Sequence, residues 1–196
     1  GEIVAHPARG FFTGNRGIIH RPDSTLGTSR WSHRHWLICT LSHPKGRYHG
    51  PMPDRGWTAL FFLDEAVALA AGHRPCHYCR REAYNAYRAA WTEAFDAPPD
   101  RMTMDGALHA ARVTRTRTQV RQEGDLGDLP DGTFILHEGR ACLVLGDRLL
   151  PYTPAQYERA WLRPTGFATI LTPAPSVAVL RHGYRPALHP SATPGA

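Results

Sequence analysis

The sequence predicts an α+β protein, and three observations support this class. Short apolar runs separated by Gly- and Pro-rich turns occupy the first and last thirds of the chain, as in antiparallel strands. Two central stretches carry apolar residues at helical spacing. A chain of 196 residues that is 42% apolar can bury a sizeable core. We expect two regions, 1–96 and 97–196, packed as one compact unit.

The first third predicts two strands and one short helix. Apolar runs at 36–41 and 57–62 are typical of strands between loops. Asp64 can cap a helix that runs through Ala71, because its side chain can accept a bond from a free backbone N–H. Gly72 then stands where helices commonly turn left-handed.

Two helices follow in the centre of the chain. Residues 81–95 place large side chains at near-helical spacing, which predicts a stripe facing the core: Tyr84, Tyr87, Trp91 and Phe95. Two prolines between Asp96 and Asp100 end this helix. A second helix is predicted over 101–112.

The alternation in residues 113–121 predicts an extended strand. In that conformation Arg115, Arg117 and Arg121 share one side and could follow a phosphate backbone. A solvated edge strand protected by its charges is the alternative.

The last third predicts a small antiparallel sheet with flanking helices. Three apolar runs separated by two-residue turns at 138–139 and 146–147 indicate a β-meander. We expect strands at 133–137, 141–145, 149–152 and 166–171, short helices at 154–161 and 175–184, and a loose tail at 186–196.

The charge of the chain favours an anionic partner. The net charge is +6 at pH 7, and all but one of the 23 basic residues (Lys45) are arginine. Backbone phosphates reward clustered cations, so nucleic acid, with DNA first, is the expected partner. The arginine excess can also reflect genome composition. The sequence has no apolar run long enough to span a membrane and no secretory signal, so it predicts a cytoplasmic protein.

The spacing Cys76-x-x-Cys79 predicts a metal site, because two thiolates at this spacing point the same way. Four cysteines in a cytoplasmic protein have little use as a disulfide framework, so we expect one structural zinc ion. Cys39 and His43 can supply the other two ligands. Cys39 can instead be a small buried apolar residue, and three histidines compete with His43: His33, His35 and His49.

Residues 61–81 combine a strand, an Ala-rich helix and the motif Gly72-x-Arg74-Pro75-Cys76-x-x-Cys79. This stretch resembles the second half of the Ada-type metal-binding domain, and with Cys39 the resemblance covers roughly residues 36–81. It implies a small zinc-organised fold that contacts the DNA backbone. In that family a zinc-bound cysteine also accepts a methyl group from damaged phosphotriesters.

The resemblance assigns roles to single residues. Cys76 and Cys79 match the second pair of zinc ligands in the family. Cys39 and His43 stand where the family has Cys-x3-Cys, with His43 in place of the second cysteine. Cys39 would therefore be the methyl acceptor. A neutral imidazole lowers the negative charge on the cluster and makes the remaining sulfurs less nucleophilic, so a purely structural zinc is the alternative.

Several other residues are candidates for catalysis. Asn15, Arg16 and His20 lie in a Gly-bounded segment that could hold a phosphate, although the glycines can also simply form turns. His33 and His35 alternate and so share a face. They could bind a second divalent metal, act as a general base or contact phosphates, or be partly buried beside tryptophans.

Asp105 and His109 are four residues apart on one helix face. A carboxylate at this spacing could orient the imidazole and raise its basicity, as proton transfer requires. A surface pairing without a catalytic role has the same spacing.

These observations favour a zinc-containing protein that processes or repairs DNA by hydrolytic attack on phosphodiester bonds. Arg80 and Arg81, next to the cysteine pair, would grip the backbone together with the basic strand. Two alternatives remain open. One is repair or sensing of alkyl phosphotriesters through Cys39, and the other is a zinc module that binds nucleic acid without catalysis.

Overall fold

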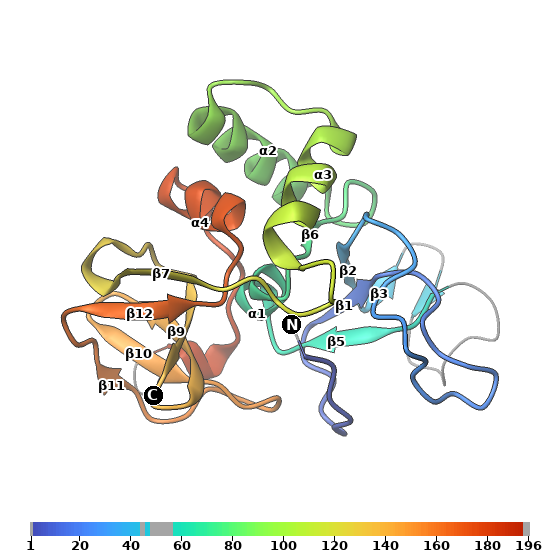
Figure 1. Cartoon of the computed structure of the whole chain (residues 1–196), viewed down its shortest axis with the longest axis horizontal. Coiled ribbons are helices and arrows are strands. Elements are labelled where there is room, and N and C mark those ends of the chain that lie inside the picture. The colour runs from blue at the N-terminus through green and yellow to red at the C-terminus, as the bar shows by residue number, and fades with distance from the viewer. Residues whose placement is uncertain (1, 44–45, 48–56, 194–196) are drawn as a thin grey trace.

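The computed structural model describes residues 2–43, 46–47 and 57–193. It confirms the α+β class, with helices and two main sheets of four and six strands. Figure 1 shows the N-terminal sheet on one side, the C-terminal sheet on the other, and α2, α3 and α4 above both.

The N-terminal sheet has the order β5-β1-β2-β6. β1 pairs antiparallel with both β2 and β5, whereas β2 and β6 are parallel. The bounds are β1 Phe12–Asn15, β2 Leu37–Thr40, β5 Leu60–Phe62 and β6 Arg74–Pro75. A separate short hairpin joins β3 Ser42–His43 to β4 Gly46–Arg47.

The edge strand β6 contains a proline without losing its pairing. Arg74 N donates to Trp36 O at 3.1 Å and Cys76 N donates to Ile38 O at 3.0 Å, so the two bonds lie on either side of Pro75. Proline is tolerated at an edge because its missing N–H faces no partner strand. The residues that follow β6 are thereby fixed against β2.

Helix α1 (Glu65–Ala70) forms as predicted. Asp64 caps it by accepting a bond from Val67 N at 3.0 Å. The helix closes at Gly72, whose φ is +82°. A Cβ there would lie 2.5 Å from the Arg112 side chain, so this position needs glycine both for its backbone and for space.

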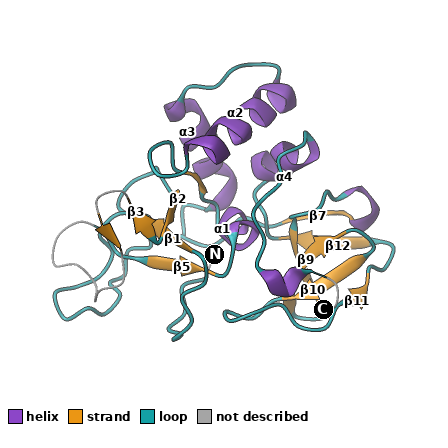
Figure 2. Ribbon diagram, turned by 180° about the vertical axis from the view of Figure 1, so that it is seen from behind, coloured by secondary structure: helices purple, strands orange, loops and turns teal. Residues whose placement is uncertain are grey.

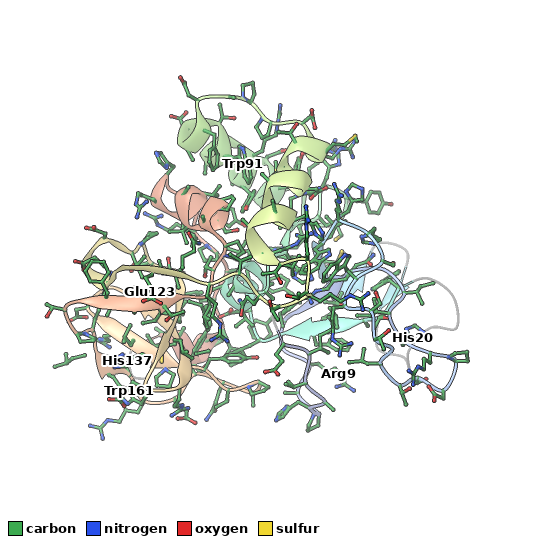
Figure 3. All side chains as sticks on the ribbon, viewed as in Figure 1. Arg9, His20, Trp91, Glu123, His137 and Trp161 are labelled. Atoms are coloured by element: carbon green, nitrogen blue, oxygen red, sulfur yellow. The ribbon has the colours of Figure 1, made fainter. Side chains whose placement is uncertain are left out.

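Helices α2 (Arg81–Phe95) and α3 (Arg101–Arg112) have the predicted bounds. The stripe on α2 packs inward at Tyr84, Tyr87 and Trp91, while Phe95 is 44% exposed. Helix α4 (Ala174–Arg181) completes the helical layer in the predicted segment. In Figure 3 Trp91 lies on α2 within this layer.

The C-terminal sheet contains the predicted meander. β8, β9 and β10 are consecutive antiparallel neighbours, and Glu138 and Gly139 both have positive φ in the turn between β8 and β9. The sheet order is β11-β10-β9-β8-β12-β7. The bounds are β7 Gln122–Asp125, β8 Phe134–His137, β9 Arg140–Leu145, β10 Arg148–Pro151, β11 Trp161–Leu162 and β12 Phe167–Ile170, with short 3₁₀ turns at Leu126–Asp128 and Pro190–Ala192.

The prediction of an extended basic strand over 113–121 is wrong. Val113 and Gln119 form an isolated bridge around a turn in which Arg117 has a φ of 66°. Hydroxyl bonds among the threonines stabilise this turn. Arg115 and Arg117 therefore lie in a turn, while Arg121 stands directly before β7.

Two predictions for the last third are also wrong. Residues 154–160 form no helix, because an isolated bridge between Tyr152 and Tyr157 and the approach to β11 occupy this segment. The tail is not loose through residue 193. Ala187 N and His189 N donate to the buried carboxylates of Glu65 and Asp64, which ties the segment to the start of α1.

Hydrophobic clusters cross the predicted boundary at residue 97. One cluster joins Ile38 of β2 to Val179 of α4. Another joins Leu63, just before α1, to Phe134 of β8. Figure 2 shows α1 between the two sheets from the opposite side. None of the helices in the described ranges has the length and hydropathy that crossing a membrane requires.

Candidate metal centre and histidine cluster

Three cysteines from two distant segments meet at one point. Cys39 lies on β2, Cys76 directly follows β6 and Cys79 lies in the turn before α2. Their Sγ atoms are all within 4.8 Å of one another. The parallel pairing of β2 with β6 brings the first thiol to the later pair, so these three cysteines could bind a metal ion.

The chemistry of the three thiols fits a cation. None of the cysteines is in a disulfide. The Cys39 thiol shares hydrogen bonds with Cys76 and Cys79, which raises the pKa of Cys39 and lowers that of Cys76 to about 2. Tyr78 N also donates to Cys76 Sγ at 3.4 Å. A bound dication would replace the shared protons and stabilise all three thiolates.

The fourth ligand is not fixed by the described residues. The backbone of His43 belongs to β3, but its side chain lies outside the described residues, as does all of His49. Within the described part of the chain, the three cysteines are the one group of His, Cys, Asp and Glu side chains with metal-binding spacing. His33 and His35 therefore form no second metal site of this kind there.

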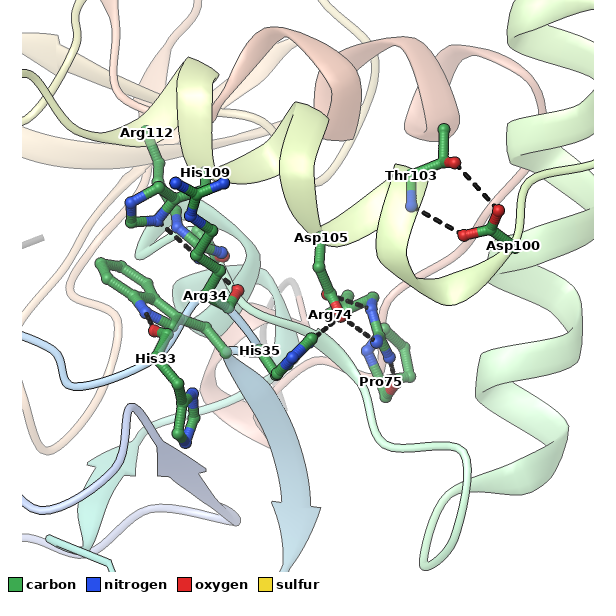
Figure 4. A network of polar contacts seen from close by, with 12 residues as sticks. His33, Arg34, His35, Arg74, Pro75, Asp100, Thr103, Asp105, His109 and Arg112 are labelled. Atoms are coloured by element: carbon green, nitrogen blue, oxygen red, sulfur yellow. Dashed lines mark hydrogen bonds and ion pairs between the residues drawn. The ribbon is translucent and has the colours of Figure 1, made fainter.

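His35 makes a short polar contact with Asp105 of α3. His35 Nδ1 lies 2.6 Å from Asp105 Oδ2 (Figure 4). Because the carboxylate accepts, the proton is assigned to Nδ1. The His35 side chain is 54% exposed, whereas that of Asp105 is 2% exposed. The pair thus has a buried acidic partner and an accessible imidazole.

Asp105 is also paired with Arg74 of β6. Arg74 Nε donates to Oδ1 and Arg74 Nη2 donates to Oδ2, each at 2.7 Å. This two-point geometry suits a planar guanidinium and a carboxylate. The predicted contact between Asp105 and His109 is replaced by these two partners, because β6 and the segment before β2 both face α3 at Asp105.

The segment that carries His35 is held by its backbone. Trp36 Nε1 donates to His33 O at 3.0 Å, and Arg112 Nη2 donates to Arg34 O at 2.7 Å. The absence of a side chain at Gly17 lets Ser32 pack against its backbone, since a Cβ at Gly17 would meet Ser32 Oγ. These contacts keep His35 turned toward α3.

His33 lies beside His35, with ring centroids 5.9 Å apart. Its Nδ1 is buried without a hydrogen-bond partner among the described residues. Burial lowers the pKa of His33, and the neighbouring His35 acts in the same direction. His33 is therefore held in its neutral form next to the His35–Asp105 pair.

His109 belongs to a different contact network. Its Nδ1 lies 3.1 Å from Arg112 Nη2, and its ring meets Trp31 edge-on at 5.3 Å. Burial lowers the pKa of His109, assisted by Arg112 and Arg34. Because Arg112 can only donate, Nδ1 is the acceptor and His109 is neutral.

Asn15, Arg16 and His20 are each engaged in contacts within the N-terminal part. Asn15 ends β1 and accepts a bond from Gly17 N at 2.7 Å. Arg16 is 3% exposed, and burial lowers its pKa to about 9. His20 is labelled in Figure 3, and its Nδ1 lies 2.6 Å from Thr58 Oγ1. These side chains make hydrogen bonds within the protein, in its interior and in the turns next to β1.

The basic candidates divide into buried and exposed residues. Arg80 donates to Glu65 at 2.6 Å and stacks on Phe12, with its side chain 9% exposed, so it is engaged inside the protein. Four others are exposed: Arg81, Arg115, Arg117 and Arg121. Arg117 donates to Thr28 O, which joins its turn to the loop before His33.

Sequence reasoning misses several residues of this region. It marks Arg74 only as part of a motif, and Arg112 only as a helix end. Arg16 and Arg112 both stack on the buried Trp36 ring, at 3.9 and 3.7 Å from its centroid. No local sequence signal marks these arginines, because their burial and the acceptors that it requires are set by the fold.

One cavity of the C-terminal part lies away from these groups. It measures about 820 Å³, and its lining includes Leu145 of β9, Trp161 of β11 and Tyr157 between β10 and β11. It contains no cysteine and neither member of the His35–Asp105 pair. The chemistry is therefore assigned by side-chain contacts and not by this cavity.

Comparison with known proteins found no match to a protein-family model, to a curated protein or to a solved structure.

Proposed function

We propose that this chain is a zinc-containing enzyme of DNA processing or repair that hydrolyses phosphodiester bonds. The contact between His35 Nδ1 and Asp105 Oδ2 carries the proposal. A half-exposed imidazole hydrogen-bonded to a buried carboxylate is the arrangement a general base requires.

In the proposed reaction His35 acts through its second nitrogen. Nδ1 is engaged with Asp105, so Nε2 can take a proton from a water molecule. The water oxygen forms a bond to phosphorus, its proton passes to Nε2, and the bond from phosphorus to the leaving oxygen breaks. The leaving oxygen takes its proton from solvent or from the imidazolium. Exposed arginines such as Arg34 would offset the charge that develops.

Zinc would be held by Cys39, Cys76 and Cys79, with His43 as the proposed fourth ligand. Three sulfur ligands favour zinc over harder cations. A closed site of this type supplies folding energy, and the resemblance to the Ada-type domain over 36–81 supports the same role. The proposed compartment is the cytoplasm, where these thiols would stay reduced.

DNA is the proposed substrate because the chain is basic and exposes arginines, among them Arg34 between the two histidines and Arg117. The net charge is +6. The bond from Arg117 to Thr28 O joins one basic turn to the loop that leads to His33. Contacts between exposed arginines and DNA phosphates would give affinity with little sequence preference.

The test is turnover by His35→Gln. Metal-loaded protein is incubated with labelled single- and double-stranded DNA, and His35→Gln should lose about 10²- to 10⁴-fold in rate. His182→Gln, at an exposed histidine on the far end of α4, is the matched control and should retain full rate. Absence of cleavage of any nucleic acid by the parent protein would end this proposal.

A second candidate function is repair of alkyl phosphotriesters. Cys39 and Cys79 are partly exposed whereas Cys76 is buried, and the resemblance to the Ada-type domain assigns the acceptor role to Cys39. Its Sγ would form a bond to the alkyl carbon while the carbon–oxygen bond breaks and a phosphodiester anion leaves. Incubation with methylated DNA should then add one methyl group to Cys39, detected by mass spectrometry. Unmodified cysteines would exclude this function.

A further inference from the structure

Arg74 stands between the metal centre and the His35–Asp105 pair. It is 3% exposed, and its guanidinium occupies both oxygens of Asp105 at 2.7 Å. Nη1 also donates to Pro75 O at 3.2 Å, and Cζ lies 5.5 Å from the centroid of the Tyr84 ring. The Arg74 side chain is thus fixed at several points.

The same pair of strands carries both groups. Leu37 of β2 faces Arg74 of β6, and Ile38 faces Pro75. One step further along, Cys39 meets Cys76 at the cysteine cluster. In the other direction, His35 lies two residues before β2. A metal that joins Cys39 to Cys76 therefore holds β6 in the register that presents Arg74 to Asp105.

We propose that Arg74 is a positioning residue that makes the His35–Asp105 pair depend on the metal centre. Metal ligation fixes β6 against β2, Arg74 fixes the plane of the Asp105 carboxylate, and the carboxylate orients His35. A role of these contacts in catalysis rests on the proposed function. The dependence of the His35 orientation on the metal centre does not.

A guanidinium is suited to this task and an ammonium is not. Arg74 reaches both carboxylate oxygens, and this fixes the rotation of Asp105 as well as its charge. Lysine in its place keeps the charge but offers a single point of contact. Arg74→Lys therefore separates positioning from simple charge neutralisation, and Arg74→Gln removes both.

The first readout is the chemical reactivity of His35, which needs no turnover. Diethylpyrocarbonate acylates neutral imidazoles, and the modified histidines can be located by mass spectrometry. The charged and titratable groups around His35 include Asp105 on α3, Arg74 on β6 and His33 in its own segment. Without Arg74, the Asp105 carboxylate is no longer held at both oxygens, so it no longer orients the His35 imidazole.

The expected result is a loss of about tenfold in the acylation rate of His35 in Arg74→Gln at neutral pH, because the carboxylate that accepts from Nδ1 is no longer held in place. Arg74→Lys should show a smaller loss in the same direction, and chelation of the metal from the parent protein should reproduce it. His182 should react at the parent rate throughout. Arg101→Gln, at an exposed arginine on the same helix as Asp105, is the matched control and should change the reactivity of neither histidine.

The outcomes separate this proposal from the proposed function. Unchanged His35 reactivity in metal-loaded Arg74→Lys and Arg74→Gln, or after chelation, overturns the coupling. If Arg74→Gln does not fold, Arg74→Lys and the chelated parent protein still decide. A parent protein that cleaves no nucleic acid overturns the hydrolase, while the acylation result still decides the coupling. If Arg74→Lys cleaves DNA at the parent rate and with the parent pH profile, the coupling is overturned as well.

Discussion

The imidazole Nδ1 of His35 lies 2.6 Å from Oδ2 of Asp105, a residue seventy positions further along the chain. The contact joins the segment before β2 to helix α3. One member is half exposed and the other is almost fully buried. This difference in burial leads to a clear expectation for stability.

Asp105→Asn should destabilise the protein far more than His35→Gln. Loss of the carboxylate leaves the buried charge of Arg74 uncompensated, at a cost of about 3–5 kcal/mol. His35→Gln removes an exposed partner and should cost about 1 kcal/mol or less. Urea unfolding of the two variants measures the difference. Equal losses would show that the Arg74–Asp105 ion pair contributes little.

Metal removal should lower stability, and the effect should require the clustered cysteines. A ligand that binds only the folded chain stabilises it by about 2.7 kcal/mol at a hundredfold excess over its Kd. Cys76→Ser should lose the metal, measured as metal per chain by elemental analysis. Thermal unfolding of this variant should then no longer respond to a chelator.

Cys142→Ala is the matched control for the metal prediction. Cys142 is fully buried on β9, within a hydrophobic cluster that contains none of the other three cysteines. This variant should keep one metal per chain and the full response to the chelator. Loss of metal from Cys142→Ala would contradict the assignment of the site.

Because His73 is buried in its neutral form, the free energy of unfolding should fall as the pH is lowered. Complete burial lowers the pKa of His73 well below 6.5, and Arg16 and Arg112 act in the same direction. Between the folded pKa and 6.5 the unfolded chain binds one more proton than the folded chain. The free energy of unfolding therefore falls as pH drops below 6.5, by about 1.4 kcal/mol per pH unit.

His73→Gln tests this pH dependence. Glutamine can still accept the bond from Arg16 Nε but does not titrate. Urea unfolding from about pH 8 to about pH 5 should give a flatter profile than the parent protein, by one proton. His182→Gln, at an exposed site, should keep the parent profile. Parallel profiles for the parent and His73→Gln would assign the acid sensitivity to other groups.

The exposed arginines of the segment 115–121 should govern the salt dependence of DNA binding. Replacing Arg115, Arg117 and Arg121 by glutamine should weaken binding and flatten the plot of log affinity against log salt. The slope should change by about 0.9 for each DNA phosphate that an arginine no longer neutralises. Fluorescence anisotropy over a salt series measures it. Arg159→Gln, at an exposed arginine in the C-terminal part, should leave the slope unchanged.

Local structure is predictable where the signal lies within a few residues. Asp64 caps α1 through a bond three residues ahead, and α2 and α3 end at Phe95 and Arg112 as predicted. Caps, prolines and helical spacing act over one or two turns, so they can be read without knowing the fold. The turn at 113–119 differs from the predicted strand because threonine hydroxyls compete with strand pairing there.

The sequence by itself determined the α+β class, the central helices and the sulfur pair, because each depends on neighbours in the chain. Tertiary structure decided the partners. It brought Cys39 to Cys76, gave Asp105 to His35 and Arg74 in place of His109, and buried Arg80 against Glu65. Which side chains meet depends on how sheets and helices pack, since a polar group that loses water takes the nearest acceptor or donor that the fold presents.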